Sequence, residues 1–557
     1  MKKKLLPLAM LAGLAGAAGT AQAVHINNDG LGEVLIYPYY SIEGGQNTYI
    51  SVVNTTEYYK AVKVRFIEAE NSQEVLDFNL YLSPEDVWTG AVVPEGDGAK
   101  IITRDNSCTV PHISRPTADN PTAVDGEAFR DLQYADDGGS TGLARTNEGY
   151  VELIEMAVVA EDGTGFGTAE GNALAADILH DPSGMPADCA AVVGRWVTSG
   201  ASFETGDIVD GTGVVSDTGT GTFNTNPNAP SMLVGTDADG TLGGLYGYGV
   251  LINPMEGTNA TYSARALDAF YDAGAFYAPN HTNPGTLEPS LQNSQVTANI
   301  LDGVTPVSFV TTDGLDAVSA LFMHDTISND FVLDEIIQAE TDWVIAMPTK
   351  RRYVFDLQDA DDAGTPWNDT LVRPPFTTEW TSNACETIEL EMWDREEAVT
   401  QLTGGVDFSP RPVGGPTSDD LTLCTEVSVM GFGEGSAVDA SDRVFYGINA
   451  EVDHENGWAR MDFTLDADGD ARYLLDAAQT QAIIGLPVTG FAVQKYTAAG
   501  VDGLSGSGAF YAGVIDHKST RLIVGYDPAN GADDGEVADG LPADPGHDGY
   551  GIDSSAP

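Results

Sequence analysis

Hydrophobic and polar residues alternate in short runs through residues 33–93, the most strongly patterned part of the chain. In one run Lys63 and Arg65 alternate with apolar residues, and residues 76–82 repeat the pattern. Successive side chains of a strand point to opposite faces of a sheet, so this period of two predicts strands with one apolar and one wet face. Turn-forming residues separate the runs at a spacing that is typical of an antiparallel sandwich.

The same strand pattern continues along most of the chain. Residues 150–156 alternate again, and we expect this strand to cover the edges of the opening sheet. Helices are expected only at 169–179 and 313–323. The pattern therefore predicts a mainly β protein: two immunoglobulin-like antiparallel β-sandwich units with long loops and few short helices.

Composition divides the chain into segments of different character. Three lysines at positions 2–4, an apolar run and a small-x-small site before Val24 are typical of a cleaved signal peptide. The expected segments are a signal peptide (1–23), a β-sandwich unit (24–203), a Gly/Thr/Asp-rich linker (204–241), a second β-rich unit (242–526) and an acidic disordered tail (527–557).

The leader predicts export to the extracellular space or the cell surface, with the periplasm as the alternative. Position 24 is valine and not the cysteine that a lipid anchor requires, so no lipid anchor is expected. No later apolar run approaches the length of a membrane-spanning helix, so no transmembrane span is expected either.

Four cysteines fit an oxidising compartment. Two lie in each half of the chain, which favours Cys108–Cys189 and Cys385–Cys424, although four cysteines allow three connectivities. No pair has the C-x-x-C spacing of zinc or thioredoxin-type sites. Two structural disulfides are therefore expected.

The chain is strongly acidic, with 25 basic and 84 acidic residues and a net charge of −59. Without the three leader lysines, 22 basic residues remain and the net charge is −62. Such a surface repels phosphates, which argues against nucleic acid as a partner. Adaptation to saline water and bound divalent cations would each account for the acidity, and the sequence leaves both open.

Asp466, Asp468 and Asp470 resemble a calcium-binding loop, since alternate aspartates can converge on one hard cation. The loop departs from the EF-hand pattern at Ala471 and Ala477, where glycine and glutamate are expected. The interpretations are a calcium site at these three aspartates and a solvated turn between strands.

No catalytic motif stands out. Ser140 lies in a G-x-S-x-G string without the strand–turn–helix context of a nucleophile elbow, which favours a plain loop. Asp516, His517 and Lys518 form a charged cluster that fits a salt bridge better than a general base. The run 393–397 predicts an ion-pair network at a strand end, and the basic run 350–352 predicts an acidic partner within the chain. We therefore expect no enzyme.

Several pieces of the sequence resemble one family. The segments YPYY, SVVNTT, VLDFNLYLSP and DREE, in this order along the chain, are similar to those of exported proteins of Gammaproteobacteria with no assigned activity. The resemblance implies that both β-rich units belong to one architecture. It implies no cofactor and no catalytic residue.

These observations predict an exported, non-enzymatic structural or assembly protein of the cell surface or extracellular space, with calcium as the candidate stabilising ion. The alternative is a secreted carbohydrate-binding or carbohydrate-active protein, because seven tryptophans and many carboxylates can form a sugar platform. The expected partners are further copies of the chain or a glycan or other component of the envelope. The face with Lys60, Lys63 and Arg65 is predicted to meet an acidic surface, on this chain or on a neighbour.

Overall fold

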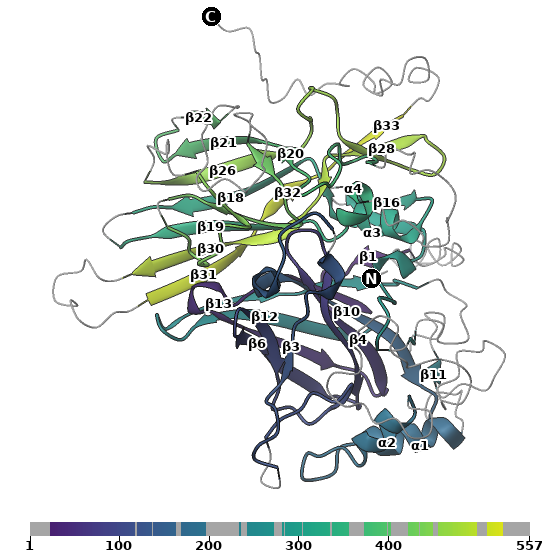
Figure 1. Cartoon of the computed structure of the whole chain (residues 1–557). Coiled ribbons are helices and arrows are strands. Elements are labelled where there is room, and N and C mark those ends of the chain that lie inside the picture. Colours follow the sequence, from purple (N-terminus) through teal and green to yellow (C-terminus); the bar gives the residue numbers. More distant parts are fainter. Residues whose placement is uncertain are drawn as a thin grey trace, which may run out of the picture.

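The computed structural model describes residues 23–526 with several gaps (Figure 1). The gaps are 117–119, 136, 163–168, 197–232, 235–241, 272–280, 283, 303–304, 335–336, 356–371, 398, 403–420, 434, 449–454 and 498–509. The predicted leader up to residue 22, most of the predicted linker 204–241 and the predicted tail 527–557 therefore lie outside the described residues.

Two antiparallel sheets form the N-terminal half. The eight-stranded sheet has the order β1 (His25–Ile26), β14 (Arg265–Asp268), β2 (Val34–Ser41), β10 (Glu148–Val159), β4 (Lys60–Glu68), β5 (Glu74–Leu82) and β8 (Cys108–Val110), with β11 (Leu233–Val234) paired to β10. The six-stranded sheet has the order β13 (Thr258–Ser263), β12 (Leu245–Asn253), β3 (Asn47–Asn54), β6 (Val87–Glu95), β7 (Gly98–Ile102) and β9 (Glu127–Ala128).

The two sheets pack against each other through their apolar sides. Val64 and Phe78 of the eight-stranded sheet share one core with Ile50 and Trp88 of the six-stranded sheet. The rings of Phe78 and Trp88 lie with centroids 5.7 Å apart. The strand predicted at 150–156 is β10, and it pairs with both β2 and β4, so it fills the edge that the opening strands leave. This packing is consistent with the predicted sandwich.

The boundary expected at residue 242 does not separate the two halves. Strand β12 pairs with β3 along its length, and β14 pairs with β2. Residues 245–268 are therefore part of the N-terminal sheets, although the sequence analysis assigned them to the second unit. The chain returns to these sheets after a long excursion, and such long-range pairing leaves no local mark in the sequence.

Two five-stranded sheets form most of the C-terminal half. The β26 sheet has the order β22 (Val399–Leu402), β21 (Glu389–Asp394), β26 (Asn456–Asp462), β18 (Thr326–Val332) and β32 (Lys518–Thr520). The β19 sheet has the order β25 (Phe445–Gly447), β24 (Val427–Gly431), β19 (Glu340–Ala346), β30 (Thr489–Thr497) and β31 (Phe510–Asp516). Smaller sheets pair β15 (Thr297–Asp302) with β16 (Thr305–Val310), β17 (Met323–His324) with β29 (Leu486–Pro487), β20 (Glu386–Thr387) with β23 (Thr422–Leu423), and β28 (Gln481–Ile484) with β27 (Tyr473–Leu475) and β33 (Leu522–Gly525).

Helices are few and short, as predicted. They are α1 (Ala169–Ile178), α2 (Cys189–Gly194), α3 (Gly314–Phe322) and α4 (Arg351–Val354), with 3-10 turns at Glu43–Gly45, Leu132–Tyr134, Leu143–Asn147 and Leu291–Asn293. Both predicted helices are confirmed, and α3 begins where the Asp313 carboxylate accepts a hydrogen bond from the Asp316 N–H at 2.9 Å. No helix in the described part of the chain is long and apolar enough to cross a membrane.

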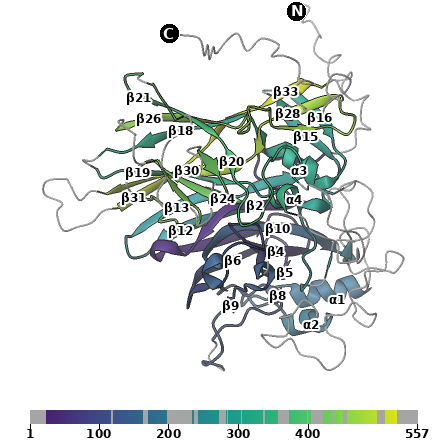
Figure 2. The same ribbon diagram turned by 45° about the horizontal axis from the view of Figure 1, so that its top comes forward.

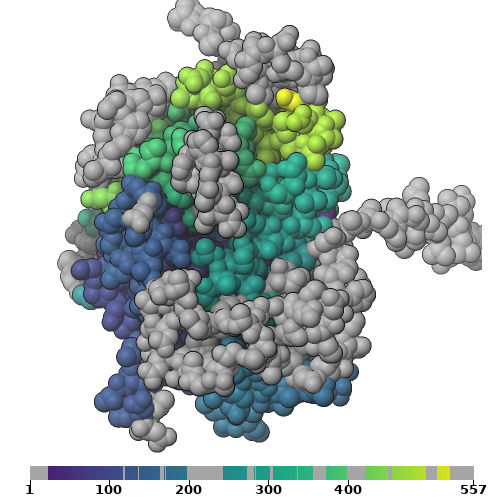
Figure 3. Space-filling view, turned by 45° about the vertical axis from the view of Figure 1, so that its right-hand side comes forward, coloured from purple at the N-terminus to yellow at the C-terminus, as the bar shows by residue number. Residues whose placement is uncertain are grey.

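The two halves share a hydrophobic core and are not independent domains. Tyr262 of β13 stacks on Phe491 of β30 with ring centroids 4.6 Å apart. Strand β31 runs beside β13, and β19 contacts β2 (Figure 2). In the space-filling view, residues of both halves form one continuous surface (Figure 3). This joint architecture agrees with the whole-chain organisation expected from the sequence.

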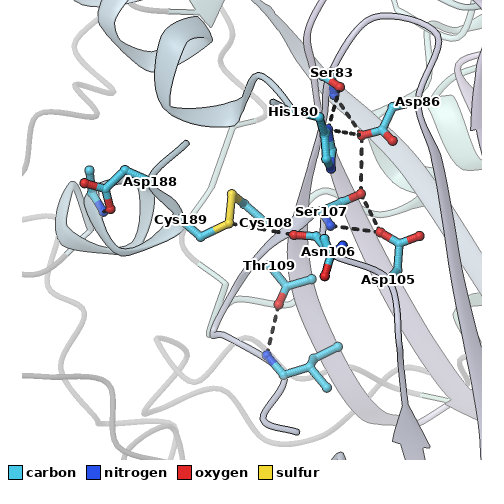
Figure 4. The surroundings of a disulfide bond; sticks show 12 residues. Ser83, Asp86, Asp105, Asn106, Ser107, Cys108, Thr109, His180, Asp188 and Cys189 are labelled. Atoms are coloured by element: carbon cyan, nitrogen blue, oxygen red, sulfur yellow. Dashed lines mark hydrogen bonds and ion pairs between the residues drawn. A yellow bond between two sulfur atoms is a disulfide. The ribbon is translucent and has the colours of Figure 1, made fainter. Parts of the chain in front are cut away.

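Both predicted disulfides are present: Cys108 pairs with Cys189, and Cys385 pairs with Cys424. The first ties β8 to the start of α2 and lies beside the hydrogen bonds of Asp105, Ser107 and Asp86 (Figure 4). The bridges close stretches separated by 81 and 39 residues. Loop closures of this length restrict the unfolded chain and stabilise the fold by about 4 kcal/mol each in the chain-entropy model.

The face of β4 that was expected to be wet is buried. All nine residues of β4 are buried, and its basic residues form ion pairs within the chain. Lys60 pairs with Glu155 at 2.5 Å, Lys63 pairs with Asp77, and Arg65 pairs with Glu152 at 2.6 Å and Glu74 at 2.7 Å. The predicted acidic partner therefore lies on the chain itself, and the prediction of a wet outer face is wrong.

The cover of this face comes from distant segments. The Lys63 ammonium donates to the backbone carbonyl oxygens of Pro284 (3.2 Å) and Thr286 (2.8 Å). From α4, Arg351 donates to the Ser72 carbonyl at 3.3 Å. A buried charge needs paired, hydrogen-bonded surroundings, and these contacts supply them.

Lys350 of the basic run 350–352 also has its partners within the chain. Lys350 is buried and donates to the carbonyl oxygens of Ala384 (2.6 Å) and Leu423 (3.4 Å). Burial lowers the pKa of Lys350 to about 8, and the neighbouring carboxyls of Glu426 and Glu386 partly oppose that shift. The expected acidic neighbours are therefore present.

Candidate functional site

The predicted calcium ligands lie in an exposed turn after β26. The Asp466 carboxylate accepts hydrogen bonds from the backbone N–H groups of Asp468 and Asp470, both at 2.9 Å. Leu465 and Ala471 close the turn as an isolated bridge. Among the described residues no group of three His, Cys, Asp or Glu side chains is placed to hold a metal ion. The carboxylate that would be the first ligand thus already organises the turn, and the calcium site stays a prediction.

Ser140 donates hydrogen bonds to a carboxylate of a buried ion cluster. Its hydroxyl and its backbone N–H both bond to the Glu70 carboxylate. The cluster is centred on Arg145, which pairs with Glu68 at 2.8 Å and Asp137 at 2.7 Å. A hydroxyl held by a carboxylate in this cluster fits the loop interpretation of the sequence.

The Asp516–His517 cluster is held by structural contacts. Asp516 pairs with Arg265 at 3.2 Å. The His517 Nε2 lies 3.1 Å from the Val344 carbonyl oxygen, to which it donates, and Nδ1 then accepts from the Asn329 amide at 3.2 Å. Burial lowers the pKa of His517 to about 4, so the ring is neutral near pH 7.

A cavity of about 330 Å³ lies beside this cluster, between β1 and β14 of the N-terminal half and β32 of the C-terminal half. Burial and then the Arg521 charge lower the pKa of His324, one of its lining residues, to about 3. Of its charged lining residues, Arg265 and Asp516 pair with each other, and the third is Lys518. Two of the three charges in the wall are therefore already paired.

The outer side of the β26 sheet differs from the cavity, because its charged and aromatic side chains are accessible to solvent. We call this surface the open face. Its residues are Glu389, Glu391 and Trp393 of β21, Trp458, Arg460 and Asp462 of β26, Thr326, Ser328 and Asp330 of β18, and Lys518 and Thr520 of β32. The residues between them, including Leu390, Met392, Ala459 and Met461, are buried in the core.

Two tryptophans form the aromatic part of the open face. Trp393 and Trp458 are direct cross-strand neighbours, and their rings stack with centroids 4.1 Å apart and planes 9° apart. Trp458 keeps 40 % of its surface exposed. The guanidinium carbon of Arg460 lies 5.6 Å from the centroid of the Trp393 ring. A flat, partly solvated indole surface is thus fixed in place by the strands and by a cation.

Polar groups flank the tryptophans in a row across the sheet. Glu391 pairs with Arg460 at 2.5 Å. Ser328 lies opposite Arg460 on the next strand, and Lys518 lies opposite Ser328. With strands about 4.8 Å apart, an acid, a cation, a hydroxyl and an ammonium stand within about 15 Å. Both donors and acceptors are available along this row.

A pair of carboxyl groups completes the face. Glu389 lies directly opposite Asp462. Burial raises the pKa of Glu389, and the neighbouring charges of Asp462 and Glu391 add to the rise. The Asp462 carboxylate accepts hydrogen bonds from the Thr464 N–H and hydroxyl. Two carboxyl groups therefore lie side by side at this end of the face.

This combination is suited to a polyhydroxylated ligand. Aromatic rings offer flat apolar surface with little conformational freedom to lose, and carboxylate, guanidinium and hydroxyl groups orient a ligand by hydrogen bonds. A sugar ring has one apolar C–H face and a rim of hydroxyls, so it can use both parts. A linear chain of sugars would run along or across the exposed strands.

The sequence analysis found only part of this site. It identified the run 393–397 as an ion-pair network, and Arg395 does pair with Glu455 at 3.4 Å. It missed Trp458 as the partner of Trp393, because cross-strand neighbours on β21 and β26 are far apart in the sequence. The alternation of Trp458, Arg460 and Asp462 is the signal that could have placed them on one face.

The chain matches no protein-family model, and comparisons with curated proteins and with solved structures gave no match.

Proposed function

We propose that this is an exported, non-enzymatic protein of the cell surface or extracellular space that attaches to a glycan of the envelope through the open face. The observation that carries the proposal is the exposed Trp393–Trp458 stack beside the Glu391–Arg460 pair. The proposal joins the two expectations from the sequence, a structural role and binding of a surface glycan.

The rest of the fold supports a structural role. Two disulfides close long stretches, and the halves share one core. Basic side chains such as Lys60 and Arg65 form ion pairs inside the protein. A cross-linked, buried-charge framework of this kind suits a protein that holds its shape outside the cell.

The open face also fits the geometry of the ligand better than the cavity does. A polysaccharide is long, and an open sheet can accept it without enclosing its ends. The cavity near His324 measures about 330 Å³, and two of its three charged lining residues, Arg265 and Asp516, already pair. The row of Glu391, Arg460 and Ser328 remains near solvent.

The test is binding of the mature protein to a microarray of bacterial and algal polysaccharides, followed by affinity electrophoresis in gels that contain the bound polysaccharides. Trp458→Ala should reduce retardation at least tenfold, and Trp458→Phe should restore part of it. Tyr511→Ala is the matched control, because Tyr511 is an exposed aromatic residue (64 %) on another sheet. Equal retardation of Trp458→Ala and the parent protein would remove the open face from the proposal.

One observation favours the alternative function, that of a carbohydrate-active protein. Burial raises the pKa of Glu389, which lies directly opposite Asp462, so the face contains two neighbouring carboxyl groups. Glycoside hydrolysis uses such a pair as acid and base or nucleophile. Release of reducing ends from a bound polysaccharide, abolished by Glu389→Gln with binding retained, would establish this activity.

A further inference from the structure

The outer side of the six-stranded sheet is a second exposed surface, with the opposite character. We call it the uncharged face. It consists of Tyr49 and Val53 of β3, Val87, Thr89, Ala91 and Val93 of β6, Tyr246, Tyr248, Val250 and Ile252 of β12, and Asn259, Thr261 and Ser263 of β13, with Ser51 of β3 buried among them. Val87 is 44 % exposed and Tyr246 is 40 % exposed. Side chains of alternate residues, such as Ile50 and Trp88, fill the core on the other side.

No residue of the uncharged face carries a charge, although the chain has 84 acidic residues. Charges on the same side of the sheet lie at its margin: Glu95 and Lys100 pair with each other at 2.6 Å at one corner, and Asp105 follows β7 near Tyr49. At the centre, the rings of Tyr49 and Tyr248 lie with centroids 6.2 Å apart. Aromatic residues at the centre of an uncharged patch are typical of a protein interface.

The charge of the chain decides what can bind there. Two copies with a net charge near −60 repel each other over most of their surfaces. They can approach closely only where neither presents acidic groups. A two-fold contact brings the same patch of both copies together, so an uncharged patch is complementary to itself. A basic partner would instead seek the acidic surface elsewhere.

We propose that the uncharged face binds the uncharged face of a second copy of this chain. The proposal is independent of glycan binding, because it uses a different sheet. Four strands about 4.8 Å apart and six or seven residues long give a patch on the order of 500 Å² per copy. Two such patches bury about 1,000 Å², which lies at the lower end of specific interfaces, so the dimer should be reversible.

Salt should strengthen this contact. Added salt shortens the range of repulsion between the acidic surfaces, while burial of apolar surface is little affected. Self-association should therefore increase between 0.05 and 1 M NaCl. A contact built on ion pairs would weaken over the same range.

The test is sedimentation velocity of the mature protein over a concentration series at both salt concentrations. The parent protein should show a concentration-dependent dimer that is stronger in 1 M NaCl. Tyr248→Glu should raise the dissociation constant at least tenfold, and Thr89→Lys, a milder change at the same face, should also raise it. Leu132→Glu is the matched control, since Leu132 is 52 % exposed and lies outside the uncharged face. Circular dichroism confirms that each variant is folded.

A parent protein that stays monomeric at all concentrations and both salt levels would overturn the proposal. Dimers that Tyr248→Glu and Thr89→Lys leave unchanged would overturn it as well. A crosslink gives a second readout: Tyr49→Cys places a thiol at the centre of the face, where a two-fold contact brings the same residue of both copies together, and it should form dimers on mild oxidation, unlike a cysteine at Leu132. Polysaccharide binding plays no part in these assays, so the two proposals fail separately.

Discussion

Strands β4 and β26 have the same alternating sequence pattern, but their polar side chains are buried on β4 and accessible on β26. On β4, Lys63 and Arg65 alternate with core residues, and both are buried and paired. On β26, Trp458 and Arg460 alternate with core residues, and both remain accessible. The difference lies in what covers the sheet. Segments distant in the sequence, at Pro284–Thr286 and α4, close over β4, whereas no described segment closes over β26 to the same degree.

The comparison separates charges that hold the fold from charges that face a partner. A buried ion pair is costly to break, because removing one partner leaves the other charge unpaired in the interior. An exposed pair contributes little to stability and is free to serve in recognition. The chain thus uses its few basic residues in two ways, and substitutions can tell them apart.

The largest effect is expected from charge reversal on β4. Arg65→Glu places a third carboxylate beside Glu152 and Glu74 and should lower the free energy of unfolding by about 3–5 kcal/mol or prevent folding. Arg460→Glu on the open face should lower it by about 1 kcal/mol or less. Denaturant unfolding of both variants checks the contrast. Equal losses would show that the two faces do not differ in this way.

The pH dependence of stability should follow the buried carboxyls. Burial raises the pKa of Asp342 in β19 to about 7. The folded protein therefore binds a proton more tightly than the unfolded chain, and this group makes stability fall as the pH rises from about 4 to about 7. Asp342→Asn should stabilise the protein by about 1–3 kcal/mol at pH 8 and have little effect at pH 4. Thermal unfolding across this range checks it; a uniform shift at both pH values would contradict it.

A smaller effect on stability is expected at the open face. Trp458→Ala removes one half of a stacked cross-strand pair and should lower the free energy of unfolding by about 0.5–1.5 kcal/mol. Polysaccharide retention should fall far more than this. Denaturant midpoints measured beside retention make the comparison. A loss of stability like that of Arg65→Glu would place Trp458 among the residues that hold the fold.

The smallest effect concerns calcium. If Asp466, Asp468 and Asp470 bind the ion, calcium at about four times its dissociation constant should stabilise the protein by about 1 kcal/mol. Chelator should reverse the gain, and Asp468→Asn should abolish it, while Asp516→Asn should not. If neither calcium nor chelator changes the unfolding temperature, the loop is a solvated turn and not a calcium site.

Much of the architecture follows from local patterns. The period of two along 33–93 predicts strands, and 169–179 and 313–323 predict helices, since these signals depend on neighbours in the sequence. The cysteine pairs Cys108–Cys189 and Cys385–Cys424 follow from their distribution between the halves. Short-range chemistry and simple counting suffice for these features.

The features that were missed all depend on distant segments. Alternation on β4 shows that Lys63 and Arg65 share a face, but not that residues near 284–286 cover it. The return of 245–268 to the N-terminal sheets, and the meeting of Trp393 with Trp458, likewise need the register of strands far apart in the chain. The sequence therefore predicted each strand of the candidate site but not that the two strands are neighbours.

Hydroxyl-radical footprinting with and without a polysaccharide that the protein retains tests the central claim most directly. Trp458 of the open face should be oxidised readily in the free protein and protected in the complex, whereas Tyr246 of the uncharged face, equally exposed at 40 %, should react alike in both. Protection of Trp458 without Tyr246 is the predicted result. Unchanged oxidation of Trp458 in the presence of a bound polysaccharide would contradict the account.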